Sequence, residues 1–198
     1  YDPAAVLASN PTALWYFEGG SGADVTGNGH DIASLSGSVA TGVTGSTGDA
    51  YQLSGQSSAV ANSGTLFGSG MSIGALVDVQ TSSWQRIFGD SNNVDNFTFG
   101  IANGGIWFLH AGHPNHIISN PVTPGLHYIV VTWQGDTVVM YVDGTEVLNY
   151  VDGPPSAAPI AGNMVFNPQG GLEYNGVLDE VAIYDHVLSA AEIAGHLG

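Results

Sequence analysis

The sequence predicts an all-β protein, a two-sheet antiparallel sandwich with one short C-terminal helix. Apolar residues alternate with polar ones or form short β-branched and aromatic runs, which is the pattern of strands. Gly, Asn, Asp or Pro closes each run, and only one segment carries a helix signal. A chain of 198 residues can bury a sizeable core, so we expect a single domain over residues 1–198.

Each expected strand is a short run between turn residues. The clearest pair joins Tyr128–Trp133 to Thr137–Val142 through Gln134-Gly135-Asp136, and Asp143-Gly144 then favours a tight hairpin turn. Glycine-rich stretches at Gly19–Gly29 and Gly37–Gly48 are expected to be loops. The full set of expected strands is Ala13–Phe17, Ala50–Leu53, Ser58–Ala61, Met71–Val79, Gln85–Phe88, Phe97–Ile101, Ile106–His110, Leu126–Trp133, Thr137–Val142, Glu146–Tyr150, Ile160–Phe166 and Gly176–Tyr184.

The one expected helix lies at the C-terminal end. Ser189-Ala190-Ala191-Glu192 is a capping-box sequence, in which the serine hydroxyl accepts from the backbone N–H of Glu192 and the glutamate accepts from the backbone N–H of Ser189. Ile193 and Leu197 continue its apolar face, so a helix of about two turns should follow the cap.

The charge balance excludes two classes of partner. Lys and Arg together number 1, Asp and Glu number 17, and the formal net charge is −16. Nucleic-acid binding depends on cationic side chains that neutralise phosphates, and Arg86 is the only one available. Docking on anionic lipid is excluded for the same reason. No apolar run approaches the length of a membrane span, so we expect no membrane insertion.

Three separated motifs resemble one known family. They are Val6-Leu7-Ala8 with Ala13–Glu18 and Asp24–Gly29; Leu126–Trp133 with Met140–Gly144; and Gly176–Tyr184 with Leu188–Ile193. In this order and spacing they resemble the laminin-G-like, concanavalin A-like lectin/glucanase jelly-roll domains found in phage virion proteins and secreted bacterial proteins. The resemblance covers nearly the whole chain. It implies two antiparallel sheets packed face to face, frequently a structural calcium ion, and binding of glycans or proteins more often than catalysis.

The resemblance also implies a calcium site. Calcium takes six to eight oxygen ligands, and the Asp24–Gly29 loop offers carboxylate, amide and carbonyl oxygens. In the resembled family this loop lies beside the C-terminal strand with the Asp-Glu pair, which makes Asp179 the second carboxylate, while Asn28 and the His30 backbone complete the shell. The alternative is that Asp24 and Asn28 form Asx turns that only shape the loop.

The candidate ligand-binding residues lie mostly in polar segments. Trp84 stands in such a segment beside the sole cation, so its ring could stack on a sugar while Arg86 or Asp90 binds hydroxyls. Trp107 is a further aromatic candidate for the same face. The alternative is a tryptophan folded over the edge of the sandwich with Arg86 paired to a carboxylate.

Two loops could also take part in binding. His110, His113 and His116 could hold a transition metal or touch a sugar, although a spacing of three residues on a Gly/Pro loop fixes no common face. The loop from Asp90 to Asn96 could be a second weak calcium or glycan loop. The alternatives are ordinary loop polarity for the histidines and a solvated hairpin tip for the acidic loop.

Catalysis is not expected. Glucanases on this sandwich place carboxylates on one strand face as Glu-x-Asp-x-x-Glu, and that array does not occur here. Asp179 and Glu180 are adjacent, but neighbouring strand residues point to opposite faces, so we expect no acid/base pair from them.

Two functions therefore compete. The first is a non-catalytic, calcium-stabilised carbohydrate-binding or adhesion module outside the cell. The second is a structural or decoration subunit of a phage particle or extracellular filament that contacts other protein subunits. Either function places the protein at an extracellular, cell-surface or virion location.

Overall fold

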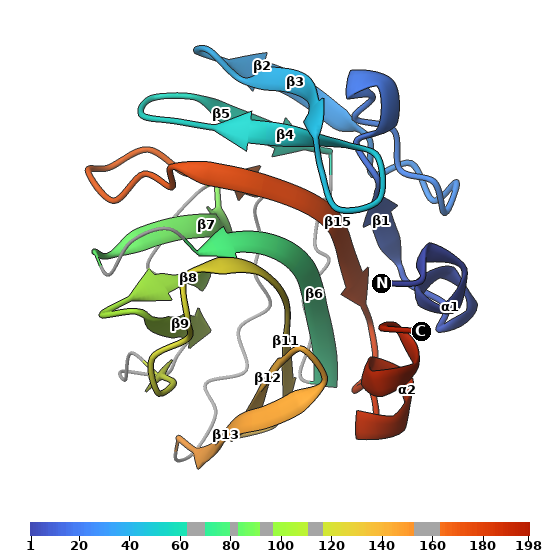
Figure 1. Cartoon of the computed structure of the whole chain (residues 1–198), viewed down its shortest axis with the longest axis vertical. Helices are drawn as coiled ribbons and strands as arrows, with labels where there is room; N and C mark the ends of the chain where they lie inside the picture. The colour runs from blue at the N-terminus through green and yellow to red at the C-terminus, as the bar shows by residue number, and fades with distance from the viewer. Residues whose placement is uncertain (63–69, 80–82, 92–96, 111–116, 153–162) are drawn as a thin grey trace.

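The computed structural model describes residues 1–62, 70–79, 83–91, 97–110, 117–152 and 163–198. These residues form two antiparallel sheets with two short α-helices and one 3₁₀ turn (Figure 1). The helices are α1 (Pro3–Ala8), η1 (Glu18–Gly20) and α2 (Ala190–Gly195). The strands are β1 (Ala13–Trp15), β2 (Ile32–Ser36), β3 (Ala40–Thr44), β4 (Asp49–Leu53), β5 (Ser58–Ala61), β6 (Gly70–Val79), β7 (Gln85–Asp90), β8 (Phe97–Ala102), β9 (Gly105–His110), β10 (Ile117–Ile118), β11 (Gly125–Gln134), β12 (Thr137–Val142), β13 (Thr145–Val151), β14 (Met164–Phe166) and β15 (Gly176–Tyr184).

The two sheets pack face to face around the main core. The eight-stranded sheet has the order β13-β12-β11-β6-β15-β4-β3, with β1 paired to β15. The seven-stranded sheet has the order β10-β9-β8-β7-β14-β5-β2. Their facing surfaces enclose the main core, which is rich in aromatic rings such as Trp15, Phe88 and Phe166. The predicted sandwich is therefore confirmed.

A second apolar cluster lies on the outer face of the eight-stranded sheet. Helices α1 and α2 contribute Val6 and Ile193, which join Tyr128 and Tyr184 of the sheet. Strand β11 is thus buried on both faces, which explains why its sequence is a continuous apolar run. The chain ends lie side by side, because the Asp2 N–H donates to the carbonyl of His196 at 2.7 Å (Figure 1).

The strongest local signals are confirmed. Strands β11 and β12 form the expected hairpin, from the pair Ile129/Val142 to the pair Gln134/Thr137. The capping box is present: the Ser189 hydroxyl accepts from the Glu192 N–H at 3.3 Å, and the glutamate accepts from the Ser189 N–H at 2.8 Å.

Two expectations about local structure are wrong. The stretch Gly37–Gly48 is not simply a loop, because it contains the edge strand β3, where Gly42 takes a φ of +67° at a break in the register. An additional helix, α1, precedes the first strand. Asp2 caps it by accepting from the N–H of Ala4 at 2.9 Å, and Pro3 occupies its first position.

Candidate functional site

Three of the predicted ligand-binding residues meet on the outer face of the seven-stranded sheet. We call Trp84, Arg86 and Trp107 the Trp84 cluster. The rings of Trp84 and Trp107 lie edge to face, with centroids 4.8 Å apart and planes at 74°. The guanidinium carbon of Arg86 lies 5.6 Å from the centroid of the Trp107 ring, which is a cation–π distance. Trp107 is 1% exposed, whereas Trp84 and Arg86 are half-buried.

Strand alternation and one glycine build this cluster. Ile106 and Phe108 face the core, so Trp107 between them faces outward. Gly100 lies on β8, between β7 and β9, and pairs with Arg86 on one side and Trp107 on the other. Because Gly100 has no side chain, Arg86 can reach across β8 to the indole ring. A Cβ at this position would collide with the carbonyl oxygen of Gln85.

A loop before β15 borders the arginine. The backbone N–H of Arg86 donates to the carbonyl of Leu172 at 2.6 Å. The backbones of Arg86 and Glu173 also form an isolated parallel β-bridge. The Glu173 carboxylate accepts from the N–H groups of Gly171 at 2.9 Å and Gly170 at 3.1 Å. These backbone donors, together with the charge of Arg86, lower the pKa of Glu173. The sole cation therefore lies beside an ionised carboxylate.

Sequence reasoning missed this carboxylate. Glu173 lies far from Arg86 along the chain, and no local pattern signals that the two residues become neighbours.

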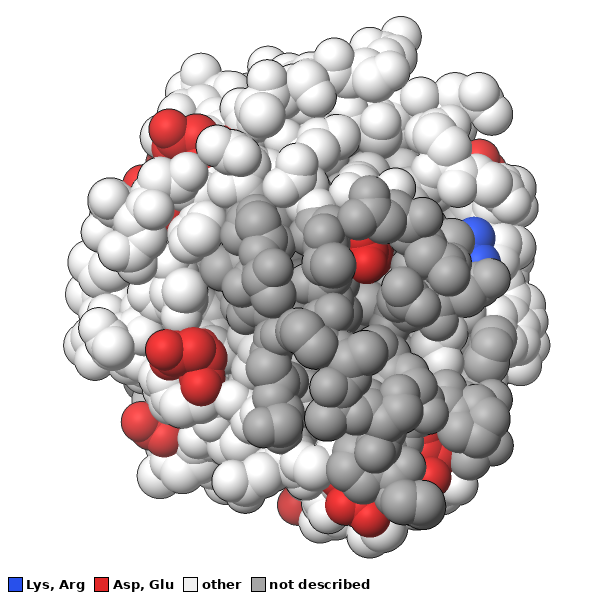
Figure 2. All heavy atoms as spheres, turned by 180° about the vertical axis from the view of Figure 1, so that it is seen from behind, with Lys and Arg blue, Asp and Glu red and all other residues white. Residues whose placement is uncertain are grey.

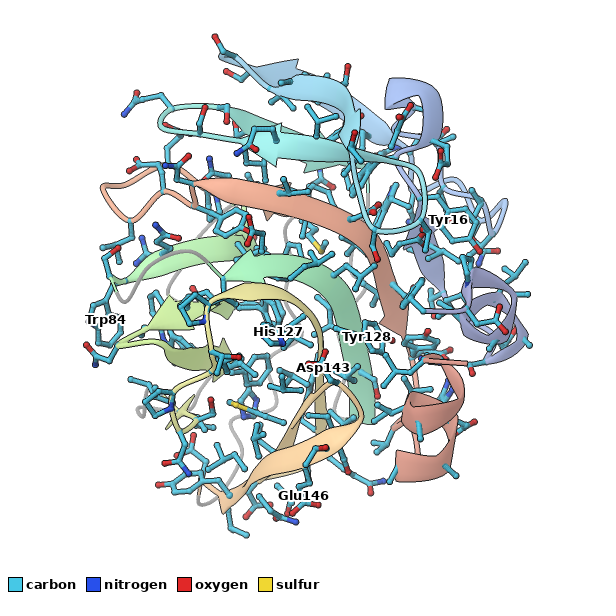
Figure 3. All side chains as sticks on the ribbon, viewed as in Figure 1. Tyr16, Trp84, His127, Tyr128, Asp143 and Glu146 are labelled. Carbon is cyan, nitrogen blue, oxygen red and sulfur yellow. The ribbon has the colours of Figure 1, made fainter. Side chains whose placement is uncertain are left out.

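Trp84 lies at one margin of the molecule (Figure 3). The Trp84 cluster thus combines a half-buried indole ring with the buried Trp107 and the half-buried Arg86, and Glu173 borders it.

The other predicted ligand residues lie elsewhere or outside the described residues. His110 is three residues beyond Trp107, so it faces the core side, where its ring stacks on Phe108 at 5.5 Å. Asp90 is 1% exposed at the end of β7, opposite Met164. His113 and His116 and residues 92–96 of the acidic loop lie outside the described residues. Asp90 and His110 therefore do not join the Trp84 cluster.

The predicted calcium loop has the contacts of an Asx turn. One Asp24 oxygen accepts from the Leu14 N–H at 3.1 Å and from the N–H and hydroxyl of Thr26 at 3.0 and 2.7 Å. The other oxygen accepts from the His30 N–H at 3.1 Å. Burial raises the pKa of Asp24, but these donors outweigh it and hold the value below 3.8. Both oxygens of Asp24 thus accept from protein donors, and these contacts shape the loop as the Asx-turn alternative expects.

The remaining predicted calcium ligands also make hydrogen bonds within the protein. The Asn28 side-chain amide donates to the carbonyl of Thr12 at 2.9 Å, and the carbonyl of His30 accepts from the Trp15 indole at 2.8 Å. Asp179 accepts from the N–H of Ser46 at 3.1 Å, and Ser46 lies on the turn between β3 and β4. Within the described ranges, no three His, Asp or Glu side chains are grouped so that they could hold a metal ion.

Calcium and the Asx turn predict different responses of stability. We expect Asp24→Ala to lower the stability by about 1–3 kcal/mol, because the buried N–H of Leu14 and the partly buried N–H groups of Thr26 and His30 lose their acceptor. We expect EDTA to leave the melting temperature of the wild type unchanged. Differential scanning calorimetry measures both, with Asp31→Ala as a variant that loses one contact of the same turn, a hydrogen bond from the Asp24 N–H at 2.8 Å. A fall in melting temperature with EDTA that added calcium reverses would restore the calcium interpretation.

Asp179 and Glu180 lie on the same face of β15, contrary to expectation. The register of β15 with β6 shifts between Asp179 and Ala182, and Glu180 takes a φ of +51°. As a result, both carboxylates face the β3–β4 turn, and Thr47 donates its hydroxyl to Glu180 at 2.5 Å. The argument that neighbouring strand residues point apart is wrong here because the bulge interrupts the alternation.

Burial perturbs both of these carboxyl groups. Asp179 is 0% exposed and Glu180 is 1% exposed. Desolvation raises the pKa of Asp179 from 3.8 to about 6 and that of Glu180 from 4.5 to about 7. The charges of Glu18 and Asp49 add to the shift of Asp179, and those of Asp179 and Glu18 add to the shift of Glu180. The second oxygen of Glu180 has no partner with hydrogen-bond geometry in the described part of the chain, although the Tyr1 hydroxyl lies close enough to lower the pKa. The pair is buried, so a substrate cannot reach it.

None of the helices within the described residues is both long and apolar enough to cross a membrane. No curated protein sequence matches the chain.

Solved structures share the fold. Domain 4 of AbnA, a GH43 extracellular arabinanase from Geobacillus stearothermophilus in complex with arabinotriose, is 17% identical, with a TM-score of 0.78 over 95% of this chain and 98% of that domain. The binding domain of botulinum neurotoxin DC is 12% identical. Its structure in complex with rat synaptotagmin II has a TM-score of 0.75 over 96% of this chain and 51% of the toxin chain. Its structure in complex with SialylT has a TM-score of 0.75 over 94% of this chain and 50% of the toxin chain. The chain thus spans about half of the toxin domain.

A family model provides the assignment. The model described as the concanavalin A-like lectin/glucanases superfamily matches residues 53–194, which is more than half of the chain and includes strands of both sheets. The chain therefore belongs to the concanavalin A-like lectin/glucanases superfamily.

Proposed function

We propose that the protein is a non-catalytic, extracellular carbohydrate-binding module and that a glycan binds at Trp84 and Arg86. The observation that carries the proposal is the half-buried Trp84 ring, fixed edge to face against the buried Trp107 at 4.8 Å. The ring face carries negative charge density, and the C–H bonds of a sugar are weakly positive, so the two attract. The base of the cluster holds the indole in place before a ligand arrives, which reduces the entropy lost on binding.

Each residue of the cluster has its own role. Trp84 offers the stacking surface, and the N–H groups of Arg86 can donate to sugar hydroxyls. Trp107 is too buried to touch a ligand, so it supports Trp84 and Arg86 from beneath. This corrects the expectation that Trp107 itself presents its ring to a glycan.

Two further facts support this proposal. The AbnA domain, which this chain matches over 98% of its length, is described in complex with arabinotriose, and the toxin binding domain, which it matches over 50%, is described in complex with SialylT. The buried position of Asp179 and Glu180 supports a non-catalytic role, because the adjacent carboxylates are out of reach of a substrate. An extracellular place fits the description of AbnA as an extracellular enzyme.

A glycan array followed by calorimetric titration tests the proposal. We expect at least one glycan to bind, and Trp84→Ala to weaken that binding by about tenfold or more, since central aromatic contacts dominate such interfaces. Tyr150→Ala is the matched control, because Tyr150 is an aromatic residue 39% exposed on the edge strand β13 of the other sheet.

Equal weakening by both variants would contradict the site. The absence of any glycan ligand would contradict the function. If the protein instead assembled into filaments or joined a particle, its function would be that of a structural or decoration subunit. Its partners would then be other protein subunits. The description of the toxin binding domain in complex with rat synaptotagmin II supports keeping this alternative.

A further inference from the structure

The sole cation of the chain lies at the proposed glycan site, and the loop that holds the Glu173 carboxylate runs beside it. Arg86 contacts the Trp107 ring at 5.6 Å and lies beside Glu173, whose pKa is lowered by the backbone donors of its loop and by the charge of Arg86 itself. Glu173 is therefore ionised at neutral pH. The Arg86 Nη1 packs against Gly170, whose N–H donates to the Glu173 carboxylate, so a carboxylate on a ligand would approach the guanidinium group close to another negative charge.

The rest of the molecule repels anions. The chain carries 17 acidic residues against this one cation. Figure 2 shows Arg86 as a small blue area at the margin of one face, with red carboxylates scattered over the same face. A net charge of −16 creates a negative potential around the protein, which slows the approach of anionic ligands and weakens their binding.

We infer that the Trp84 cluster selects neutral glycans and discriminates against those that carry carboxylate or sulfate groups. This inference rests on the proposed function and names its ligand class. Stacking on Trp84 needs no ligand charge, and a neutral hydroxyl group that accepts from Arg86 is not repelled by the nearby Glu173 carboxylate. An acidic sugar must overcome both the local carboxylate and the long-range potential.

Ionic strength provides a distinctive readout. Exposed charges act over about 30 Å in 0.01 M salt but over only about 8 Å in 0.15 M salt. Binding of a neutral glycan should change by less than roughly twofold between these two conditions. The acidic counterpart should bind at least roughly fivefold more weakly in the dilute salt, and this gap should narrow as salt is added.

The experiment uses an array of neutral glycans printed beside their uronic-acid, sialylated and sulfated counterparts, followed by titration of the best matched pair in both salts. Glu173→Gln should raise the affinity for the acidic member relative to the affinity for the neutral one. Glu146→Gln is the control, because it changes the net charge equally but lies on β13 of the other sheet (Figure 3).

The outcomes separate the two claims. Retention of neutral glycans alone, with the expected effect of Glu173→Gln, supports the inference. An acidic glycan that binds best, weakens as salt is added and is lost in Arg86→Gln overturns the inference but keeps the proposed function. If no glycan of either class binds, the proposed function fails and the inference falls with it.

Discussion

Glu180→Gln should raise the melting temperature by about 6–12 °C near pH 8 and change it little near pH 4. Burial raises the pKa of Glu180 from 4.5 to about 7 and that of Asp179 from 3.8 to about 6. The native state therefore holds these protons more tightly than the unfolded chain does. The resulting stabilisation is fully present below about pH 4 and is lost as the pH rises to about 7.

The size of the effect follows from the pKa shift of Glu180. Each unit corresponds to 1.36 kcal/mol, so ionising Glu180 in place costs about 3 kcal/mol. Glutamine removes this cost and keeps an oxygen that can accept from Thr47. Asp24 acts in the opposite direction: its lowered pKa gives stability that is lost as the pH falls below 3.8. We therefore expect maximal stability near pH 4–5.

Thermal unfolding at several pH values measures this prediction. Glu146→Gln is the control, because it removes an exposed carboxylate from β13. It should not alter the shape of the pH profile. A Glu180→Gln variant that shifts the melting temperature equally at both ends of the pH range would show that Glu180 is not protonated on folding.

The second large effect concerns the buried member of the Trp84 cluster. Trp107→Ala should lower the stability by about 3–5 kcal/mol, because a large buried ring is lost and a cavity remains. Trp84→Ala should cost less than half as much, since Trp84 is only half-buried. Urea unfolding measures both values. Trp107→Phe, which keeps an aromatic ring at the position, should recover much of the loss.

This pair of variants separates support from contact. If Trp107→Ala were as mild as Trp84→Ala, Trp107 would not be the base of the cluster. If Trp84→Ala destabilised the protein as strongly as Trp107→Ala, Trp84 would serve the packing of the fold. The alternative of a structural tryptophan folded over the edge of the sandwich would then hold.

Local signals were sufficient for much of the fold. The β11–β12 hairpin and the Ser189 cap depend on residues close together in the chain, so their patterns could be interpreted directly. Strands β2 and β3 were missed because they are exposed edge strands, with two Ser in β2 and two Thr and one Gly in β3, and no apolar alternation. Helix α1 was missed although Asp2 and Pro3 form a standard helix start.

The candidate site could be predicted only in part. Trp84 and Arg86 were found because they stand together in a polar segment, and Trp107 was proposed as an aromatic on the same face. Glu173 and the role of Gly100 depend on strand pairing across the sheet, which no local pattern reveals. The bulge at Glu180 was equally hidden, because it reverses the rule of alternating faces.

Chemical-shift mapping of the indole and guanidinium N–H groups tests the central claim most directly. Nuclear magnetic resonance spectra of the protein are recorded while a glycan retained on the array is added. We expect the largest shifts at the Trp84 indole N–H and the Arg86 side-chain N–H, with the Trp15 indole, whose N–H donates to the carbonyl of His30, unchanged. Shifts that leave Trp84 and Arg86 unaffected while the glycan binds would place the site elsewhere and contradict the account.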